Sequence, residues 1–244
     1  MESQSVTFVH AADLHLSAGD AAYGLAVLAE LVGQCRELRP AALLLCGDIF
    51  DTRRDAAQLA EAFRDALGGL AGIPVLMIPG NHEALGDDTP LAPAELAPAT
   101  LLAGLPLATR MLGEADVEVV GLPFRHSFDG YLDWPLPPRQ TRWRVGLLHG
   151  VVNGMCYTGD SAEAEQSIID PHLFQHLGLD YAALGHIHRR GEQRHQQCLA
   201  HYPGSARVWR RGRKARARPR GSRWGPRACA PRPCLSPRRD ATCR

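Results

Sequence analysis

Lysine is missing from the first 205 positions of this 244-residue chain, and the only lysine is Lys214. There is also no run of about 18 apolar residues, which excludes a transmembrane helix, and the opening Met1–Ser5 lacks the basic and apolar parts of a secretory signal. The seven cysteines contain no C-x-x-C pair, which argues against a zinc ribbon and a disulfide framework. We therefore expect a cytoplasmic protein, without a membrane partner, whose scattered cysteines are small buried hydrophobes.

Charge divides the chain into two parts. Residues 1–205 hold 13 arginines and 25 acidic residues, a net charge of −12, whereas residues 206–244 hold 13 arginines, one lysine and one aspartate, a net charge of +13. The second part is rich in Arg and Pro and shows no apolar periodicity, so it cannot bury enough surface to offset the entropy of ordering. The sequence predicts an acidic domain over 1–205 and a disordered basic tail over 206–244.

Short apolar runs indicate buried strands in an α/β protein. Six such runs occur. Five of them each lead into a turn that contains His, Asp or Asn, whereas the sixth, 117–122, does not. The five runs are 6–10, 42–46, 74–78, 145–148 and 181–184. Apolar residues recur at helical spacing over 25–32 and 59–67, and Asp170-Pro171 predicts a short helix that ends at Gly178. Pro90–Pro106 is predicted to be helical, and Phe124–Arg142 a long loop. Alternating strands and helices predict layered, partly parallel sheets, whose ligands gather beyond the carboxyl ends of the strands.

The five turns supply a set of metal-binding side chains. Their motifs are D-x-H, G-D-x-x-D, G-N-H-E, H-G and G-H-x-H. Seven candidate ligands occur in them: Asp13, His15, Asp48, Asn81, His149, His186 and His188. Carboxylate, imidazole and amide oxygen without sulfur suit Mn²⁺, Fe or Zn²⁺ and do not suit copper(I) or an iron–sulfur cluster. Each motif alone is common in turns, but five of them after buried strands favour a site. Asp48 is the natural bridge between two metals, since Gly47 allows a tight turn there.

In this order and spacing the motifs resemble the calcineurin-like metallophosphoesterases, over Val6 to about Ser205. The opening Val9–Leu16 and the late Tyr202–Ser205 are similar to the branch of the SbcD-type DNA repair exonucleases. The resemblance implies a sandwich of two β-sheets flanked by helices, with the catalytic domain in residues 1–205. It also implies an SbcC-type ATPase as a possible partner.

The resemblance also implies a role for each residue. One metal would be held by Asp13, His15, Asp48 and His188. The other would be held by Asp48, Asn81, His149 and His186. His82 would face the substrate as a catalytic residue that protonates the leaving group, and Asp51 would orient His82. Two divalent ions, most often Mn²⁺, would clamp the attacking and leaving oxygens and activate the attacking hydroxide.

Three functions follow from these observations. The leading hypothesis is a metal-dependent phosphodiester hydrolase that acts on DNA as an exonuclease of DNA repair. The second is a phosphoesterase for nucleotides or other small phosphoesters, since a nuclease surface normally gathers Lys and Arg. The third is a nucleic-acid-binding protein with a basic tail and a vestigial core. An intact ligand set argues against the third.

The remaining histidines and tryptophans are interpreted as structural. His10 lies within the first strand and is expected to be a hydrogen-bonded interior residue, while His126 is placed in a solvated loop. Trp134 and Trp143 could stack on bases, but packing is the simpler interpretation. Four further histidines are expected at the surface or in packing roles: His172, His176, His195 and His201.

The abrupt change after Ser205 has a second explanation, an out-of-frame reading of a normal phosphoesterase C-terminus. The residues from Arg207 to Arg213 can be written in codons that, read one base later, spell Gly-Phe-Gly-Glu-Glu-Gly-Glu, which resembles the continuation of the family. Under this hypothesis nothing from 206 to 244 packs against the domain. The rival is a genuine Arg-rich tail that binds phosphates.

Overall fold

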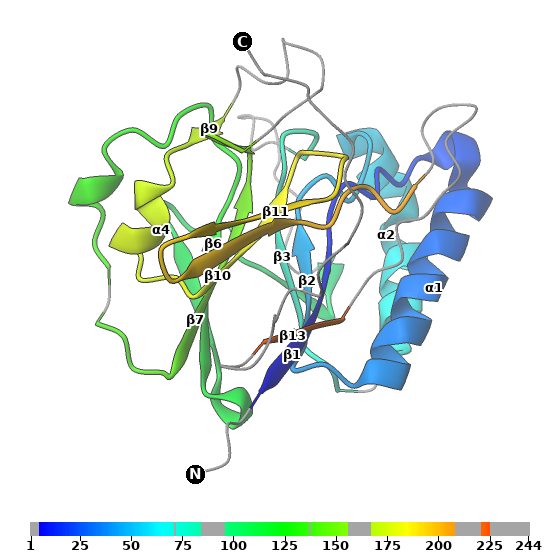
Figure 1. The fold of residues 1–244 in the computed structure, drawn as a ribbon. Coiled ribbons are helices and arrows are strands. Elements are labelled where there is room, and N and C mark those ends of the chain that lie inside the picture. Colours follow the sequence, from blue (N-terminus) through cyan, green and yellow to red (C-terminus); the bar gives the residue numbers. More distant parts are fainter. Residues whose placement is uncertain are drawn as a thin grey trace, which may run out of the picture.

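The computed structural model describes residues 5–70, 72–83, 96–136, 138–155 and 167–207, together with the backbone of 221–224. Two β-sheets form its centre (Figure 1). The first has the order β13 (Gly221–Trp224), β1 (Val6–Ala11), β2 (Ala42–Cys46), β3 (Val75–Ile78), β4 (Ala99–Leu101). In it β1 to β4 are parallel and β13 runs antiparallel to β1.

The second sheet has six strands, with four parallel strands inside and an antiparallel strand at each edge. Its order is β11 (Gly191–His195), β12 (Cys198–Tyr202), β10 (Tyr181–Gly185), β7 (Trp143–His149), β6 (Val117–Leu122), β5 (Ala108–Leu112). A separate small pair consists of β8 (Val151–Val152) and β9 (Ile168–Ile169). All six predicted strands are therefore present.

Successive side chains of each strand point to opposite faces of its sheet, and this explains how the sheets stack. Phe8 of β1 faces the second sheet, whereas its neighbour Val9 faces the helices. In the second sheet Tyr181 points to the same interior as Phe8, and Ala182 points to the opposite face. Both faces of each sheet are thus covered, which is why the sequence shows continuous apolar runs. The predicted layered α/β sandwich is confirmed.

Helices cover the two outer faces. The helices α1 (Ala21–Leu38) and α2 (Arg53–Gly68) lie on the side of β1 to β3, and α4 (His172–His176) lies on the other side, beside the second sheet (Figure 1). Among the described residues there are also three short 3₁₀ segments: η1 (Ala18–Asp20), η3 (Gly113–Ala115) and η4 (Tyr131–Asp133). Within the described ranges, no helix combines the length and apolarity needed to cross a bilayer.

Local sequence signals account for the helix ends. The hydroxyl of Thr52 accepts the Asp55 amide hydrogen at 3.1 Å and begins α2. The carboxylate of Asp170 accepts the His172 amide hydrogen at 2.9 Å, and Gly178, with φ of 62°, follows α4. The short helix predicted between Asp170 and Gly178 is therefore confirmed.

One element differs from its prediction. Helix was predicted for Pro90–Pro106, but Ala99–Leu101 is the strand β4, which pairs in parallel with β3. Pairing with an exposed sheet edge outweighs the local preference of a short Ala- and Leu-rich segment. Residues 84–95 lie outside the described part of the chain. Phe124–Arg142 contains only η4 among its described residues, as expected for a long loop.

The expectation that nothing after Ser205 packs against the domain is wrong for the described residues there. Ala206 packs on the core beside α1 and α2, the Arg207 side chain is buried, and Gly221–Trp224 pairs with β1 along Val6–Val9. The backbone of β13 satisfies hydrogen bonds that β1 would otherwise expose at the edge of its sheet. The other residues of 206–244 lie outside the described ranges.

Candidate metal centre

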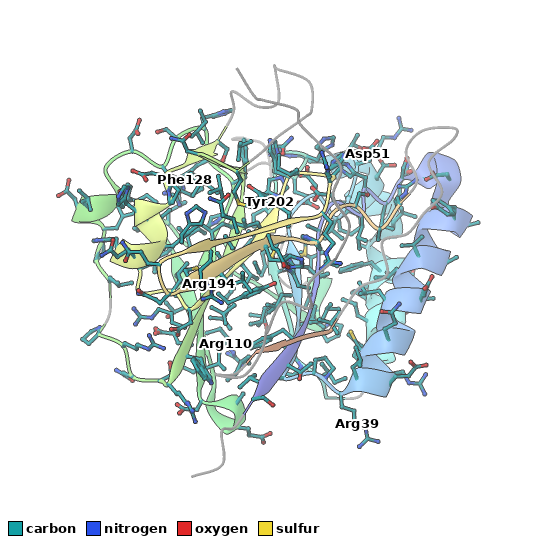
Figure 2. All side chains as sticks on the ribbon, viewed as in Figure 1. Arg39, Asp51, Arg110, Phe128, Arg194 and Tyr202 are labelled. Carbon is teal, nitrogen blue, oxygen red and sulfur yellow. The ribbon has the colours of Figure 1, made fainter. Side chains whose placement is uncertain are left out.

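The predicted ligands come together where the parallel strands of both sheets end. Asp13 and His15 follow β1, Asp48 follows β2, and His149 is the last residue of β7. Parallel strands bring their carboxyl ends to one edge, so turns far apart in sequence meet there. In Figure 2, Asp51 and Tyr202 lie toward the upper end of the molecule, while Arg39, at the end of α1, lies at the opposite end.

Four of the predicted ligands have left-handed backbones. The φ angles are 55° at Asp13, 43° at His15, 53° at Asp48 and 94° at His186. Such a conformation costs a non-glycine residue about 1–3 kcal/mol and persists only where the surroundings hold it. Gly47 precedes Asp48 with φ of 80°, and a Cβ there would lie 2.4 Å from Nδ1 of His149. The tight turns thus bring the side chains inward at the expense of stability.

The first group of ligand atoms belongs to Asp13, His15 and His188, which lie within 4.8 Å of one another. Nε2 of His15 is 3.2 Å from Nε2 of His188, and the latter is 3.9 Å from Oδ1 of Asp13. The Asp51 carboxylate lies 3.2 Å from Nδ1 of His15 and can only accept there when ionised, so Nδ1 donates. Nε2 of His15 is then left with its lone pair directed to the group, as a ligand requires.

The second group belongs to Asp48, His149 and His186, again within 4.8 Å of one another. The amide oxygen of Asn81 joins it, 3.0 Å from Nε2 of His149 and 3.1 Å from Nδ1 of His186. Nδ1 of His149 donates to the carbonyl oxygen of Cys46 at 2.8 Å, which again leaves Nε2 as the coordinating nitrogen. The structure therefore brings together all seven predicted ligands.

Asp48 lies between the two groups. Its Oδ2 is 3.3 Å from Nε2 of His149 and 3.9 Å from Nε2 of His15. A third set within 4.8 Å consists of His15, Asp48 and His82, which places His82 beside the same carboxylate. This is the position that a bridging ligand needs, although the bridging role itself remains a prediction.

The electrostatics of the site fit divalent cations. Burial raises the pKa of Asp13 to about 8, although His149 opposes the shift. Burial also lowers the pKa of His15 to about 3, so this imidazole is neutral and able to coordinate. Burial alone would raise the Asp48 pKa, but His149 outweighs it and holds that pKa below its usual range. Burial would lower the pKa of His149, but the Asp48 carboxylate outweighs it and raises that pKa to about 9, so a metal ion would have to displace the proton on its Nε2. Carboxylates and imidazoles gathered in this way form a donor set suited to Mn²⁺, Fe or Zn²⁺.

Asp51 contacts His82 through its backbone carbonyl group, whereas its carboxylate is directed to His15. Nδ1 of His82 donates to the backbone carbonyl oxygen of Asp51 at 2.6 Å, while the Asp51 carboxylate is 3.7 Å from that nitrogen and is engaged with His15. The His82 ring stands perpendicular to the His15 ring at 4.5 Å, and its side chain is 36% exposed. Nε2 is therefore the ring nitrogen available to a substrate.

Sequence reasoning gave no role to Glu83, which lies directly after His82 in the G-N-H-E motif. The residue is buried, and its Oε2 accepts amide hydrogens from Asp48 at 2.9 Å and Gly80 at 2.8 Å. Oε1 accepts from Ile49 at 2.5 Å and Phe50 at 2.8 Å. Burial raises the pKa of Glu83 to about 7. The acid at this motif position was the available signal, but only the fold shows that it faces the Asp48 turn.

Tyr202 is a second residue without a predicted role. Its hydroxyl accepts the Val152 amide hydrogen at 2.9 Å and donates to the carbonyl oxygen of Gly150 at 2.7 Å. It thereby holds the turn that follows His149. The Tyr202–Ser205 motif carried the family resemblance, yet its contacts join segments about 50 residues apart in sequence.

The other aromatic residues mostly follow their structural interpretation. Buried His10 bonds to the Tyr181 hydroxyl at 3.1 Å and to the Leu184 carbonyl at 3.2 Å, as an interior residue of β1 should. Trp134 packs against the guanidinium group of Arg125, whose Cζ lies 4.4 Å from the centroid of the tryptophan ring. The His126 ring lies 5.5 Å from that of Phe124, which in turn lies 6.1 Å from the ring of the predicted ligand His149.

A cavity of about 1070 Å³ lies away from this site. The described residues around it include Thr7, Arg39, Arg110 and Trp143, from the start of β1, the end of α1 and the start of β7, and none of the predicted site residues. The volume of this cavity therefore does not identify the candidate site, which is identified by the side chains that converge at the ends of the strands.

A family model for calcineurin-like phosphoesterases matches residues 6–190. The chain belongs to the calcineurin-like phosphoesterase family, and it carries groups of side chains that could hold metal ions. It is similar to the "Uncharacterized metallophosphoesterase YhaO" of Bacillus subtilis (strain 168), with 27% identity over 82% of this chain and 53% of the relative. The chain thus spans about half the length of that curated relative.

One solved structure shows a similar fold, and a second is compared beside it. The first superposes with a TM-score of 0.51 at 15% identity and covers 83% of this chain and 91% of the other. The protein TT1561 of Thermus thermophilus gives a TM-score of 0.49 at 12% identity over 83% of this chain and 90% of its own.

Proposed function

We propose that this protein hydrolyses phosphodiester bonds of DNA, from an end of the strand, with two divalent metal ions. The observation that carries the proposal is the placement of Asp48 between two groups of ligands, 3.3 Å from His149 and 3.9 Å from His15. The similarity of Val9–Leu16 and Tyr202–Ser205 to the SbcD-type exonucleases supports DNA as the substrate. The partial exposure of His82 and His188 supports access for a polymer.

In the proposed hydrolysis, the metal ligands and His82 have different roles. Two cations, which we propose to be Mn²⁺, would be held by the seven ligands and would supply positive charge that polarises a phosphoryl oxygen and makes water more acidic. Two hydrogen bonds hold His82 in place. Its Nδ1 donates to the backbone carbonyl oxygen of Asp51, and its backbone amide donates to Oδ1 of Asp48 at 2.9 Å. A proton on Nε2 of His82 would offset charge on the phosphoryl group and pass to the leaving oxygen as the P–O bond breaks.

A second candidate substrate is a small phosphoester. Residues 1–205 carry a net charge of −12 and no lysine, which repels a polyanion more than a small ester. The third hypothesis, a vestigial core with a nucleic-acid-binding tail, has less support because all seven ligands converge. We also propose a cytoplasmic location and, from the resemblance, an SbcC-type ATPase as partner.

The test uses three substrates with Mn²⁺: linear duplex DNA, covalently closed circular DNA and bis-p-nitrophenyl phosphate. Asp48→Ala is assayed beside the wild type to exclude a contaminating nuclease. Mononucleotides released from linear but not from closed DNA support an exonuclease. Cleavage of the small ester alone supports the second candidate, and metal binding without any cleavage supports the third.

A further inference from the structure

The segment just after the Tyr202–Ser205 motif touches the backbone of the first metal-ligand loop. The Ser205 hydroxyl donates to the carbonyl oxygen of Asp13 at 2.8 Å. Nη1 of Arg207 donates to the carbonyl oxygen of Leu14 at 3.3 Å and to that of His15. Three successive carbonyl groups of the loop are thus bound by two side chains located about 190 residues later.

The segment is also tied to a third ligand of the same group. The Ser205 amide donates to the carbonyl oxygen of His188 at 3.1 Å, and the Arg207 amide donates to the Ser205 hydroxyl oxygen at 3.2 Å. Gly204 has φ of 75°, and a Cβ there would lie 3.1 Å from the His188 carbonyl oxygen. Asp13, His15 and His188 are therefore all held through their backbones by residues 204–207.

Arg207 is built into the protein. Its side chain is 6% exposed, Nη2 is paired with the carboxylate of Asp20 at the start of α1, and its guanidinium lies 5.4 Å from the centroid of the Tyr23 ring. A planar guanidinium with several donors can contact two carbonyls and a carboxylate at once, whereas an ammonium group cannot match that fork. The positive charge also lies beside a loop whose Asp13 and His15 have left-handed φ angles of 55° and 43°.

We infer that Arg207, with Ser205, is a positioning residue for the metal site formed by Asp13, His15 and His188. Arg207 lies beyond residues 6–190 that the family model matches, and composition alone placed it in the tail. The two residues hold the strained loop so that its two side chains meet His188. The second group of ligands, which includes Asn81, His149 and His186, is not reached by these bonds. The inference rests on the metal-binding part of the proposed function and not on the substrate.

The experiment titrates metal-free protein with Mn²⁺. Calorimetry gives the number of bound ions and their affinities, and electron paramagnetic resonance distinguishes a chain with one bound Mn²⁺ from a chain with two neighbouring ions. For Arg207→Ala we expect the affinity of one site to fall about 10–100-fold and that of the other to stay unchanged. Intermediate Mn²⁺ concentrations would then give one bound ion in place of two. Arg194→Ala is the matched control, because Arg194 is exposed on β11 (Figure 2) and bonds locally, to the Gln197 carbonyl at 3.1 Å.

Two variants identify the weakened site. In a His188→Ala background, Arg207→Ala should add little further loss, whereas in an Asn81→Ala background it should retain its full effect. Added guanidinium, well below denaturing concentration, should partly restore the site in Arg207→Ala, and urea should not. Ser205→Ala should weaken the same site.

Several outcomes would overturn the inference. Two Mn²⁺ bound by Arg207→Ala with wild-type affinity would do so, and so would equal weakening of both sites. If Arg207→Ala does not fold, Arg207→Lys and Ser205→Ala carry the test, and wild-type binding of both ions by these variants overturns it. A wild-type chain that binds no Mn²⁺ contradicts the metal centre itself, which separates failure of the proposed function from failure of the positioning role.

Discussion

Glu83 holds the backbone of Asp48, the residue that lies between the two groups of ligands: Oε2 accepts the Asp48 amide hydrogen at 2.9 Å. Three further amides, from Ile49, Phe50 and Gly80, bond to the same carboxylate. The Glu83 carboxyl group thus lies close to the metal centre without being one of the predicted ligands, and it orders the turns that follow β2 and β3.

From this relationship we predict that Glu83→Gln destabilises the protein by about 2–4 kcal/mol, because the amide nitrogen faces two N–H groups whose hydrogens it cannot accept. Chemical denaturation of the metal-free protein measures the change. Glu61→Gln, at an exposed position of α2, is the control and should change stability by less than about 0.5 kcal/mol. Equal stability of the two variants would contradict the role given to Glu83.

Asp48→Ala should abolish both metal binding and phosphodiester hydrolysis, because its carboxylate adjoins both groups of ligands. Metal analysis after gel filtration should show that both ions are lost, against two retained by the wild type. Asp65→Ala removes an exposed carboxylate of α2 and should leave both measurements unchanged. Retention of two ions and full activity in Asp48→Ala would rule out the bridging assignment.

His82→Ala should keep both metals and lose about 10²–10⁴-fold in turnover, as expected for removal of a general acid or charge stabiliser. The seven other residues already supply both sets of ligands. The assay is steady-state hydrolysis at saturating Mn²⁺, with His172→Ala, whose side chain is 75% exposed, as the control. Loss of one ion in His82→Ala would instead make His82 a ligand, as its place beside His15 and Asp48 allows.

Acid should destabilise the pair of buried histidines between the sheets. Burial, with the positive charge of Arg190, lowers the pKa of His201 to about 4, and burial also lowers that of His10. The unfolded chain therefore takes up the proton first, so this part of the stability is complete above pH 6.5 and is lost as pH falls toward 4. The loss from His201 amounts to about 3 kcal/mol.

The measurement compares unfolding free energies of wild type and His201→Gln, both metal-free, at several pH values between 4 and 7. A glutamine can still bond to the Tyr181 hydroxyl, which lies 3.0 Å from Nδ1 of His201, and it does not titrate. The difference between the two proteins should shift in favour of the variant as pH falls. A difference that is constant with pH would contradict the prediction.

Sequence alone predicted six of the strands, the order of the motifs and the candidate ligands. A run such as Ala42–Cys46 is apolar at every position because both faces of its sheet are covered, and this is a local pattern that any reader of the sequence can see. The five turns then supply the side chains, since a strand that ends in a tight turn leaves them at the sheet edge. The chemistry of the donors follows from their residue types.

Only the tertiary structure decided how these turns are held. Glu83 meets the turn at Asp48, Asp51 engages His82 by its carbonyl and His15 by its carboxylate, and Arg207 reaches the carbonyls of a loop that precedes it by about 190 residues. Such contacts leave no periodic trace, because each depends on two distant segments meeting with one backbone geometry. The charge pattern even assigned Arg207 to the tail, although its burial beside Asp20 makes it part of the domain. Composition reports the average character of a segment, whereas a buried hydrogen bond depends on the position of one residue.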